Sequence, residues 1–336
     1  MPSQAPEYSG SSHIPPASDA KTLAALSGDP SPAPSGSPPT ASAPPVVVPR
    51  LPGTPDLQPD GSYLFSGGGL ELLVDPKRSG RALRFALDGK NVLAGPELLP
   101  DGFGTTFWPS PQSDWTWPPP PEIDGKPYSA ELEGSVLVLK SEASTKLGLA
   151  VIKRYRLDTA RRSVEVAYTL VNTGDRPRKA APWEIHRLPT AGGLTFYPSA
   201  QKLYPQSTLK LNAWSPITWF VHDQHREPKQ VKSFADGAEG WLAYTAESLL
   251  LIKSFGDTPE AAHAPGQGEI QIYADYDATT KQHRYVEVEQ QGPYAEIPAG
   301  GSSTWNVRWF LRKLPPTVAA KSGNQELVGF VRGVIQ

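Results

Sequence analysis

Hydrophobic and polar side chains alternate with a period of two through residues 61–315, which is the pattern of β-strands with one buried face. The clearest runs are Ser163–Asn172 and Thr304–Arg312. Shorter runs of the same kind are Leu70–Val74, Arg81–Leu87, Val136–Lys140, Leu149–Leu157, Trp183–Leu188, Trp241–Tyr244, Leu249–Phe255, Glu269–Tyr273 and Tyr285–Gln290. Turn signals such as Asp88-Gly89 separate them, and no strand–helix–strand alternation is visible. The pattern predicts an all-β, antiparallel sandwich or barrel.

The two ends of the chain follow other patterns. Residues 1–60 hold 15 of the 38 prolines and none of the nine tryptophans, so they bury too little apolar surface to offset the entropy of ordering. We expect a disordered Pro/Ser/Ala-rich tether that limited proteolysis removes. Residues 316–336 predict a linker and a short helix, because Leu327, Val331 and Ile335 recur at helical spacing. The helix packs on the sandwich or, in the alternative, docks a partner.

Composition narrows the class of function. Lys and Arg total 32 against 34 Asp and Glu, so the basic excess of a nucleic-acid-binding protein is missing and no nucleic acid is expected as a partner. No apolar run approaches the roughly 20 residues of a membrane-spanning helix. The chain has no cysteine, which removes disulfides, thiolate metal sites and cysteine nucleophiles. We expect neither a metal nor a cofactor.

The first segment with unusual chemistry is residues 102–121, in which Trp108, Trp115 and Trp117 stand among prolines. A proline-stiffened loop would hold these indoles, with Gln112 between them, ready to stack on the CH faces of a sugar ring. Trp115 and Trp117 would share a face on an extended backbone. The alternative is that the tryptophans simply cover one end of the core. In either case the prolines argue against a central strand here.

Two strands carry candidate acid–base residues. On a strand over residues 183–188, Glu184 and His186 point to one face, while Trp183 and Arg187 point to the other. A carboxylate beside an imidazole is a candidate general acid–base pair, although a structural ion pair is the commoner fate of such a motif.

The second of these strands covers residues 285–290, and on it Glu287 and Glu289 share a face. Two carboxylates in a cleft raise each other's pKa, which predicts a bound ligand unless that face is open to solvent.

These segments, in this order, resemble the galactose mutarotase-like (aldose 1-epimerase-like) proteins, and most closely an uncharacterised bacterial domain-of-unknown-function family within that group. The resemblance is carried by the turn RALRFALDGKNVL, the FWPSPQ loop, the segment VEVAYTLVNTGDRPRKAAPWEIHRL and the segment YVEVEQQGPYAEIPAGGSSTWNVRWFL. It implies an antiparallel supersandwich that binds a sugar on a concave sheet. Proline-rich tethers are also typical of exported bacterial proteins, so we expect a periplasmic or extracellular location, with the leader removed from the printed sequence.

The resemblance also implies roles for residues. His186 or Glu184 would take the place of the family's acid histidine, and Glu289 that of its base glutamate. Where classical epimerases read Thr-Asn-His-x-Tyr-Phe-Asn-Leu, this chain reads Pro-Trp-Glu-Ile-His-Arg-Leu. We therefore expect a carbohydrate-binding domain, with Trp108, Gln112, Trp115, Trp117 and Glu287 contacting the sugar. The alternatives are an epimerase-like enzyme using Glu184, His186 and Glu289, and a non-catalytic structural or protein-binding envelope domain.

Overall fold

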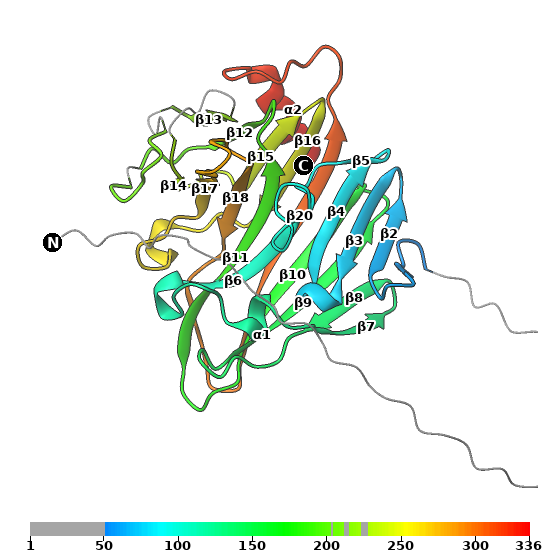
Figure 1. The fold of residues 1–336 in the computed structure, drawn as a ribbon, viewed down its shortest axis with the longest axis vertical. Coiled ribbons are helices and arrows are strands. Elements are labelled where there is room, and N and C mark those ends of the chain that lie inside the picture. Colours follow the sequence, from blue (N-terminus) through cyan, green and yellow to red (C-terminus); the bar gives the residue numbers. More distant parts are fainter. Residues whose placement is uncertain (1–50, 203, 212–214, 223–227) are drawn as a thin grey trace, which may run out of the picture. The chain divides into compact units, whose positions relative to one another are not determined.

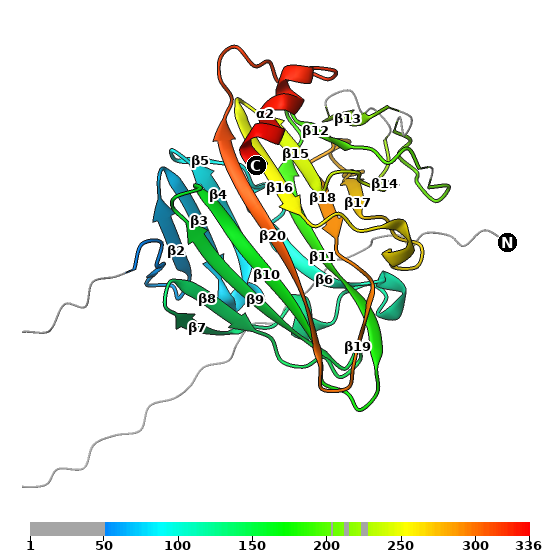
Figure 2. The ribbon, with the colours of Figure 1, turned by 180° about the vertical axis from the view of Figure 1, so that it is seen from behind.

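The computed structural model describes residues 51–202, 204–211, 215–222 and 228–336, which fold into three antiparallel sheets (Figures 1 and 2). The all-β antiparallel prediction is confirmed. The smallest sheet has five strands in chain order, namely β1 (Asp56–Leu57), β2 (Tyr63–Gly67), β3 (Leu70–Asp75), β4 (Arg81–Leu87) and β5 (Lys90–Asn91).

The largest sheet has nine strands and forms the base of the fold. In spatial order they are β13 (Ile217–Val221), β12 (Leu194–Pro198), β15 (Trp241–Ala246), β16 (Leu249–Phe255), β20 (Ser302–Lys313), β10 (Ser163–Asn172), β9 (Leu149–Asp158), β8 (Val136–Lys140) and β7 (Ser129–Glu133). The predicted strands Ser163–Asn172 and Thr304–Arg312 are the central neighbours β10 and β20, with Val166 opposite Val307. Long alternating runs therefore lie where both strand edges are hydrogen-bonded.

The third sheet has six strands. They are β14 (Val231–Ala235), β17 (Ile270–Ala274), β18 (Tyr285–Gln291), β11 (Arg178–Pro189) and β19 (Ala295–Ile297), with β6 (Thr105–Ser110) on the other edge of β11. The expectation of a loop over residues 102–121 is thus wrong for residues 105–110. These residues form an edge strand, and the prolines are compatible with it because an edge strand leaves some backbone N–H positions unpaired.

Helices are few. They are the 3₁₀ turns η1 (Pro76–Arg78), η2 (Gln112–Asp114) and η4 (Glu260–Ala262), and the α-helices α1 (Pro121–Asp124) and α2 (Gln325–Ile335). Asn324 caps α2 by accepting a hydrogen bond from the backbone N–H of Glu326. Leu327, Val328 and Val331 of α2 are buried against the nine-stranded sheet, which agrees with the predicted packed helix. No helix in the described ranges has the length and apolar character needed to cross a membrane.

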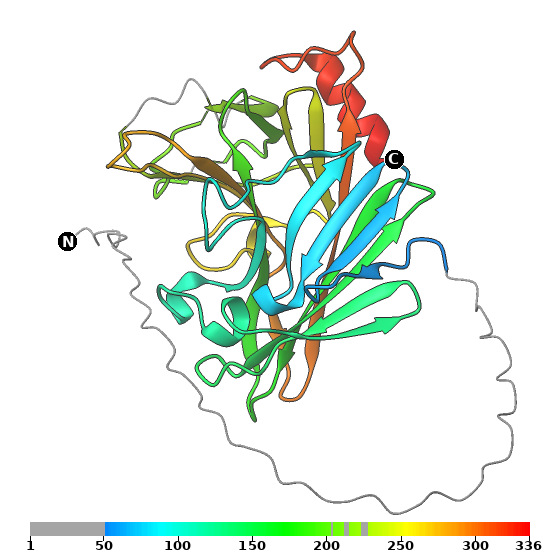
Figure 3. The ribbon, with the colours of Figure 1, turned by 45° about the vertical axis from the view of Figure 1, so that its right-hand side comes forward.

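Trp309 of β20 lies close to side chains of both smaller sheets. It lies 6.0 Å from the ring of Phe85 on the five-stranded sheet and 4.5 Å from His186 on the six-stranded sheet. The two smaller sheets therefore cover the same face of the nine-stranded sheet (Figure 3). The opposite face, around Phe310 and Ile252, packs against α2.

The described chain also corrects the expected boundary of the tether. Residues 1–50 lie outside the described residues, but β1 pairs with β2 through Asp56 opposite Leu64. The folded part therefore begins before residue 60. Two residues are enough for an edge strand when the neighbouring strand is already held on its other side, as β2 is by β3.

Candidate functional site

Strand β11 separates two groups of polar side chains onto opposite faces of the six-stranded sheet. The alternation expected from the sequence holds: Glu184 and His186 face the nine-stranded sheet, while Trp183 and Arg187 face away from it. We call the side that carries Trp183, Ile185 and Arg187 the outer face. The two groups differ in their hydrogen bonds and in the exposure of their side chains.

The group facing the nine-stranded sheet is a buried polar network around Glu184, in which Gln290 Oε1 has no hydrogen-bond partner among the described residues. One carboxylate oxygen accepts hydrogen bonds from the Tyr168 hydroxyl at 2.6 Å and the Trp309 indole at 2.9 Å. The other oxygen accepts from the Lys253 ammonium and the Gln290 amide. All of these side chains are buried. Four donors satisfy the buried carboxylate, which is what a structural role requires.

His186 belongs to the same network and is fully buried. Its Nδ1 lies 2.9 Å from the Lys253 Nζ. Burial, and then the positive charge of Lys253, hold the pKa of His186 well below its usual value. The ring is therefore neutral at pH 7, and its Nε2 has no hydrogen-bond partner among the described residues. Neither Glu184 nor His186 reaches the surface, and their catalytic roles stay predictions.

The outer face carries the second group, arranged in rows by strand register. Glu289 lies opposite Ile185 on β11 and opposite Gln271 on β17, and Gln271 lies opposite Phe234 on β14. The adjacent row contains Arg187, Glu287, Tyr273 and Lys232. Glu287 and Glu289 share a face, as expected, but it is the face of Trp183 rather than that of His186. The register therefore places His186 and Glu289, the predicted acid and base, on opposite faces of the six-stranded sheet.

Glu289 is the centre of the outer face. Its Oε2 accepts hydrogen bonds from the Trp183 indole at 2.8 Å and from the Lys232 ammonium at 3.0 Å. The Lys232 ammonium also lies 4.7 Å from the centre of the Trp183 ring, within cation–π range. Burial raises the pKa of Glu289 to about 7, although Lys232 acts in the opposite direction. Desolvation of the carboxylate outweighs the attraction of an ammonium that is itself 25% exposed.

Three buried oxygens on this face have no hydrogen-bond partner among the described residues: Oε1 of Glu289, of Gln271 and of Gln291. The amide nitrogens of both glutamines are engaged by Gln267, at 3.0 and 3.2 Å. The side-chain amides are thus held with their oxygens free. Unpaired buried acceptors are costly, so a cluster of them indicates water or a ligand that brings hydrogen-bond donors.

The second carboxylate of the pair has a different environment. Glu287 accepts a hydrogen bond from Arg187 Nε at 2.8 Å, and Arg187 Nη1 donates to the Gly102 carbonyl at 2.6 Å. Both side chains are nearly buried. The Arg187 guanidinium thus pairs with Glu287 beside Glu289. The predicted contact of Glu287 with a sugar stays a prediction.

The expected tryptophan platform is only partly formed. Trp108 is buried, with its indole donating to Asp124 at 2.7 Å, and Trp115 is buried, with its indole donating to the Pro109 carbonyl at 2.7 Å. Trp117 is 41% exposed. The backbone is not extended here, because Gln112 lies in η2 and Thr116 has a φ of 59°. Trp115 and Trp117 therefore do not share an exposed face, and of the three only Trp117 is available to solvent.

The buried indoles nevertheless connect to the outer face. The ring of Trp108 lies 5.1 Å from that of Trp183, edge to face, and 5.8 Å from those of Trp115 and Trp117. Asp124 of α1 anchors this cluster by also accepting from Arg81 and Thr106. The segment 102–121 thus supports Trp183 from the side.

Lys232, Gln271 and Gln291 were not expected as site residues. Residues 231–235 form a strand too short to stand out by alternation. Gln271 lies on a predicted strand, Gln291 directly follows one, and neither is charged. Register connects Lys232 and Gln271 to Glu289 through β17, and it places Gln291 opposite Trp183. Within the described ranges, no three His, Asp or Glu side chains form a group that could hold a metal ion.

Comparison with solved structures supports the fold. A candidate aldose 1-epimerase from Escherichia coli K12 superposes with a TM-score of 0.53 at 13% identity, covering 75% of this chain and 99% of the other. The Slr1438 protein of Synechocystis sp. PCC 6803 gives 0.54 at 13% identity, covering 80% and 100%. A galactose mutarotase-like protein from Lactobacillus casei ATCC 334 gives 0.52 at 10% identity, covering 75% and 100%. At these identities the likeness is one of fold, and the fold is that of the galactose mutarotase-like supersandwiches.

The sequence itself matches one family. No curated protein matches it. Residues 101–312, which make up more than half of the chain and include β6, β11 and β18, match the family described as "Domain of unknown function (DUF4380)". The chain belongs to this family.

Proposed function

We propose that this protein binds a carbohydrate on the outer face of its six-stranded sheet. The observation that carries the proposal is the cluster of three buried acceptors without donors among the described residues, Oε1 of Glu289, Gln271 and Gln291. Sugar hydroxyls are donors of the required kind, and several on one ring could satisfy neighbouring acceptors. The indole of Trp183 beside this cluster supplies the apolar surface that a sugar's CH groups need.

Access to this cluster is controlled by Lys232. Glu289 and Trp183 are buried, whereas the Lys232 side chain, which bonds to one and lies over the other, is 25% exposed. A ligand reaches the free oxygen of Glu289 past the Lys232 ammonium. Lys232 can then donate to a ring or hydroxyl oxygen while Glu289 accepts.

The test is calorimetry of the full chain against a panel of neutral monosaccharides. Glu289→Gln removes a charged acceptor and should weaken binding about tenfold, the usual difference for one hydrogen bond to a charged group. Glu165→Gln is the matched control, because Glu165 pairs with Arg156 and Arg308 on the nine-stranded sheet. Trp183→Phe should also weaken binding, with Trp219→Phe as its control, since Trp219 stacks on Phe196 of β12. A wild type that binds no sugar, or an unchanged Glu289→Gln variant, would refute the proposal.

A second candidate function is proton transfer at the anomeric centre of the bound sugar. The observation that favours it is the pKa of Glu289 near 7, the range in which a carboxylate is an effective general base at neutral pH. Lys232, with its Nζ 3.0 Å from Glu289, would take the place that the sequence assigned to His186 as the acid. Polarimetry of freshly dissolved sugars measures this activity. If the wild type binds a sugar but does not accelerate its mutarotation, the protein is a binding domain only.

A further inference from the structure

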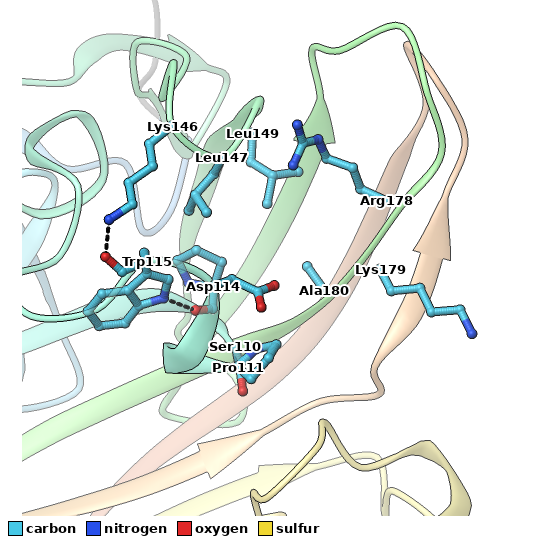
Figure 4. A pocket seen from close by; sticks show the side chains of 11 residues that line it. Ser110, Pro111, Asp114, Trp115, Lys146, Leu147, Leu149, Arg178, Lys179 and Ala180 are labelled. Atoms are coloured by element: carbon cyan, nitrogen blue, oxygen red, sulfur yellow. Dashed lines mark hydrogen bonds between the residues drawn. The ribbon is translucent and has the colours of Figure 1, made fainter. Parts of the chain in front are cut away.

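A separate pocket of about 240 Å³ lies between the end of β6, the turn before β9 and the start of β11 (Figure 4). Apolar atoms of Pro111, Leu147, Leu149 and Ala180 form part of its wall. Trp115 also lines it, and this indole separates the pocket from Trp108 and the outer face. Glu289, Lys232 and Trp183 do not contribute to it. The pocket is therefore independent of the proposed carbohydrate site.

Two opposite charges line this pocket without pairing. Figure 4 shows the Arg178 guanidinium on one side and the Asp114 carboxylate on the other, with Leu149 between them. Neither side chain makes a salt bridge or a hydrogen bond with another described residue. Their charges are thus available to a ligand that bridges them.

The guanidinium is placed by the backbone beneath it. A Cβ added to Gly148 would lie 3.0 Å from both Nε and Nη2 of Arg178, so the absence of a side chain at residue 148 lets the guanidinium lie against the turn. Gly148 has a φ of +60°, and its N–H donates to the Ser144 carbonyl at 2.7 Å, which fixes this turn. The Arg178 guanidinium thus lies against the Gly148 turn at one edge of the pocket.

The two lysines that line the pocket are directed elsewhere. The Lys146 ammonium donates to the Trp115 carbonyl, and the Lys179 side chain points away from the pocket in Figure 4. Lys146, Arg178 and Lys179 against Asp114 still leave an excess of positive charge around the opening. This excess favours a ligand with a net negative charge.

We propose that this pocket binds a small sugar acid, with its carboxylate on Arg178 and its hydroxyls on Asp114. Guanidinium and carboxylate groups match in a two-point, charge-assisted contact. Asp114 would repel a bare anion, but it accepts hydrogen bonds from hydroxyl groups that the same ligand carries. A pocket smaller than the roughly 300 Å³ of a typical ligand site suits a single ring.

The test is calorimetric titration of the full chain with glucuronate, with glucose as the neutral ligand of the same ring and with sodium sulfate as a bare anion. Glucuronate should bind more tightly than either. Arg178→Ala should weaken glucuronate binding about ten- to hundred-fold. Arg156→Ala is the matched control, because it removes the same charge from the nine-stranded sheet and should leave binding unchanged. Asp114→Asn should weaken the binding of glucuronate and strengthen that of sulfate, since a repelling charge is lost.

Several results would overturn the proposal. They are a glucuronate affinity that Arg178→Ala leaves unchanged, sulfate binding as tight as glucuronate binding, an effect of Arg156→Ala as large as that of Arg178→Ala, or no heat with glucuronate. Binding should also weaken as NaCl is raised, because Arg178 is exposed and its charge is screened. Gly148→Ala offers a second variant that keeps the charge but displaces the guanidinium, and it should weaken glucuronate binding as well. Neutral-sugar binding in Arg178→Ala reports on the outer face alone, so the two sites fail or succeed separately.

Discussion

Replacing Glu289 by glutamine should stabilise the protein at alkaline pH and leave its stability nearly unchanged at acidic pH. The carboxyl group has a pKa of about 7 in the folded protein, against 4.5 for an ordinary glutamate. Between these values the folded state keeps a proton that the unfolded state has released. Stability therefore falls as pH rises from about 4.5 to 7, and the loss is complete above pH 7.

The size of the effect follows from the width of that interval. A difference of about 2.5 pKa units corresponds to roughly 3 kcal/mol, at 1.36 kcal/mol per unit. Glutamine cannot ionise, so the variant avoids this cost. It loses the ion pair with Lys232, but that ammonium is 25% exposed and recovers hydration, which makes the loss small. We expect Glu289→Gln to be about 1–3 kcal/mol more stable than the wild type at pH 8, and equal to it within about 1 kcal/mol at pH 4.5.

Urea denaturation at both pH values measures this difference. Glu269 also has a pKa raised to about 7 by burial, and it contributes the same pH dependence to both proteins. The difference between variant and wild type therefore isolates Glu289. Two results would show that burial does not destabilise the Glu289 carboxylate. They are a variant less stable than the wild type at pH 8, and a difference in stability between the two proteins that does not change with pH.

Four further results are expected. Glu269→Gln should lose about 1–3 kcal/mol of stability in urea denaturation, even at low pH. The two oxygens of Glu269 accept backbone N–H groups of Gly237 and Thr258, and a glutamine has only one oxygen to accept them. Glu184→Ala should lose about 3–5 kcal/mol in the same assay, since the ammonium of Lys253 stays buried without its partner. His186 should titrate by NMR well below the range of an ordinary histidine, because burial and Lys253 lower its pKa. Leu327→Ala should cost about 2–5 kcal/mol, as this α2 side chain is fully buried on the nine-stranded sheet.

Alternation along a single strand was readable from the sequence, and it was sufficient for the fold. The runs Ser163–Asn172 and Thr304–Arg312 became the central strands β10 and β20, and the C-terminal helical stripe became α2. Period-two alternation survives because each strand has one face toward a core, whatever its partner is. Several strands are not predicted by alternation, among them β1, which has two residues and so no period, and β6, where Pro109 argues against a ladder.

The candidate site depends on the register between strands, which the alternation within a single strand does not specify. Glu289 pairs with Ile185, and so it lies on the face of Trp183. A shift of one residue between β11 and β18 would have placed Glu289 beside Glu184 and His186 instead. The two segments are about 100 residues apart in the chain, and nothing within either of them encodes that register. The tryptophans were misjudged for a similar reason: Asp124, which binds the Trp108 indole, comes from a helix of only four residues.

Glu184 and Glu289 are both fully buried carboxylates, and they lie on opposite faces of the six-stranded sheet. The hydrogen-bond donors around each carboxylate distinguish their roles. Glu184 has four donors for its two oxygens, so no hydrogen-bonding capacity remains for a ligand. Glu289 has two donors on one oxygen and none among the described residues on the other, next to two glutamine oxygens in the same condition. A buried carboxylate whose two oxygens are both paired can stabilise a fold, whereas one with an unpaired oxygen costs stability unless something pairs it. The residue that destabilises the folded protein is therefore the better candidate for contact with a ligand.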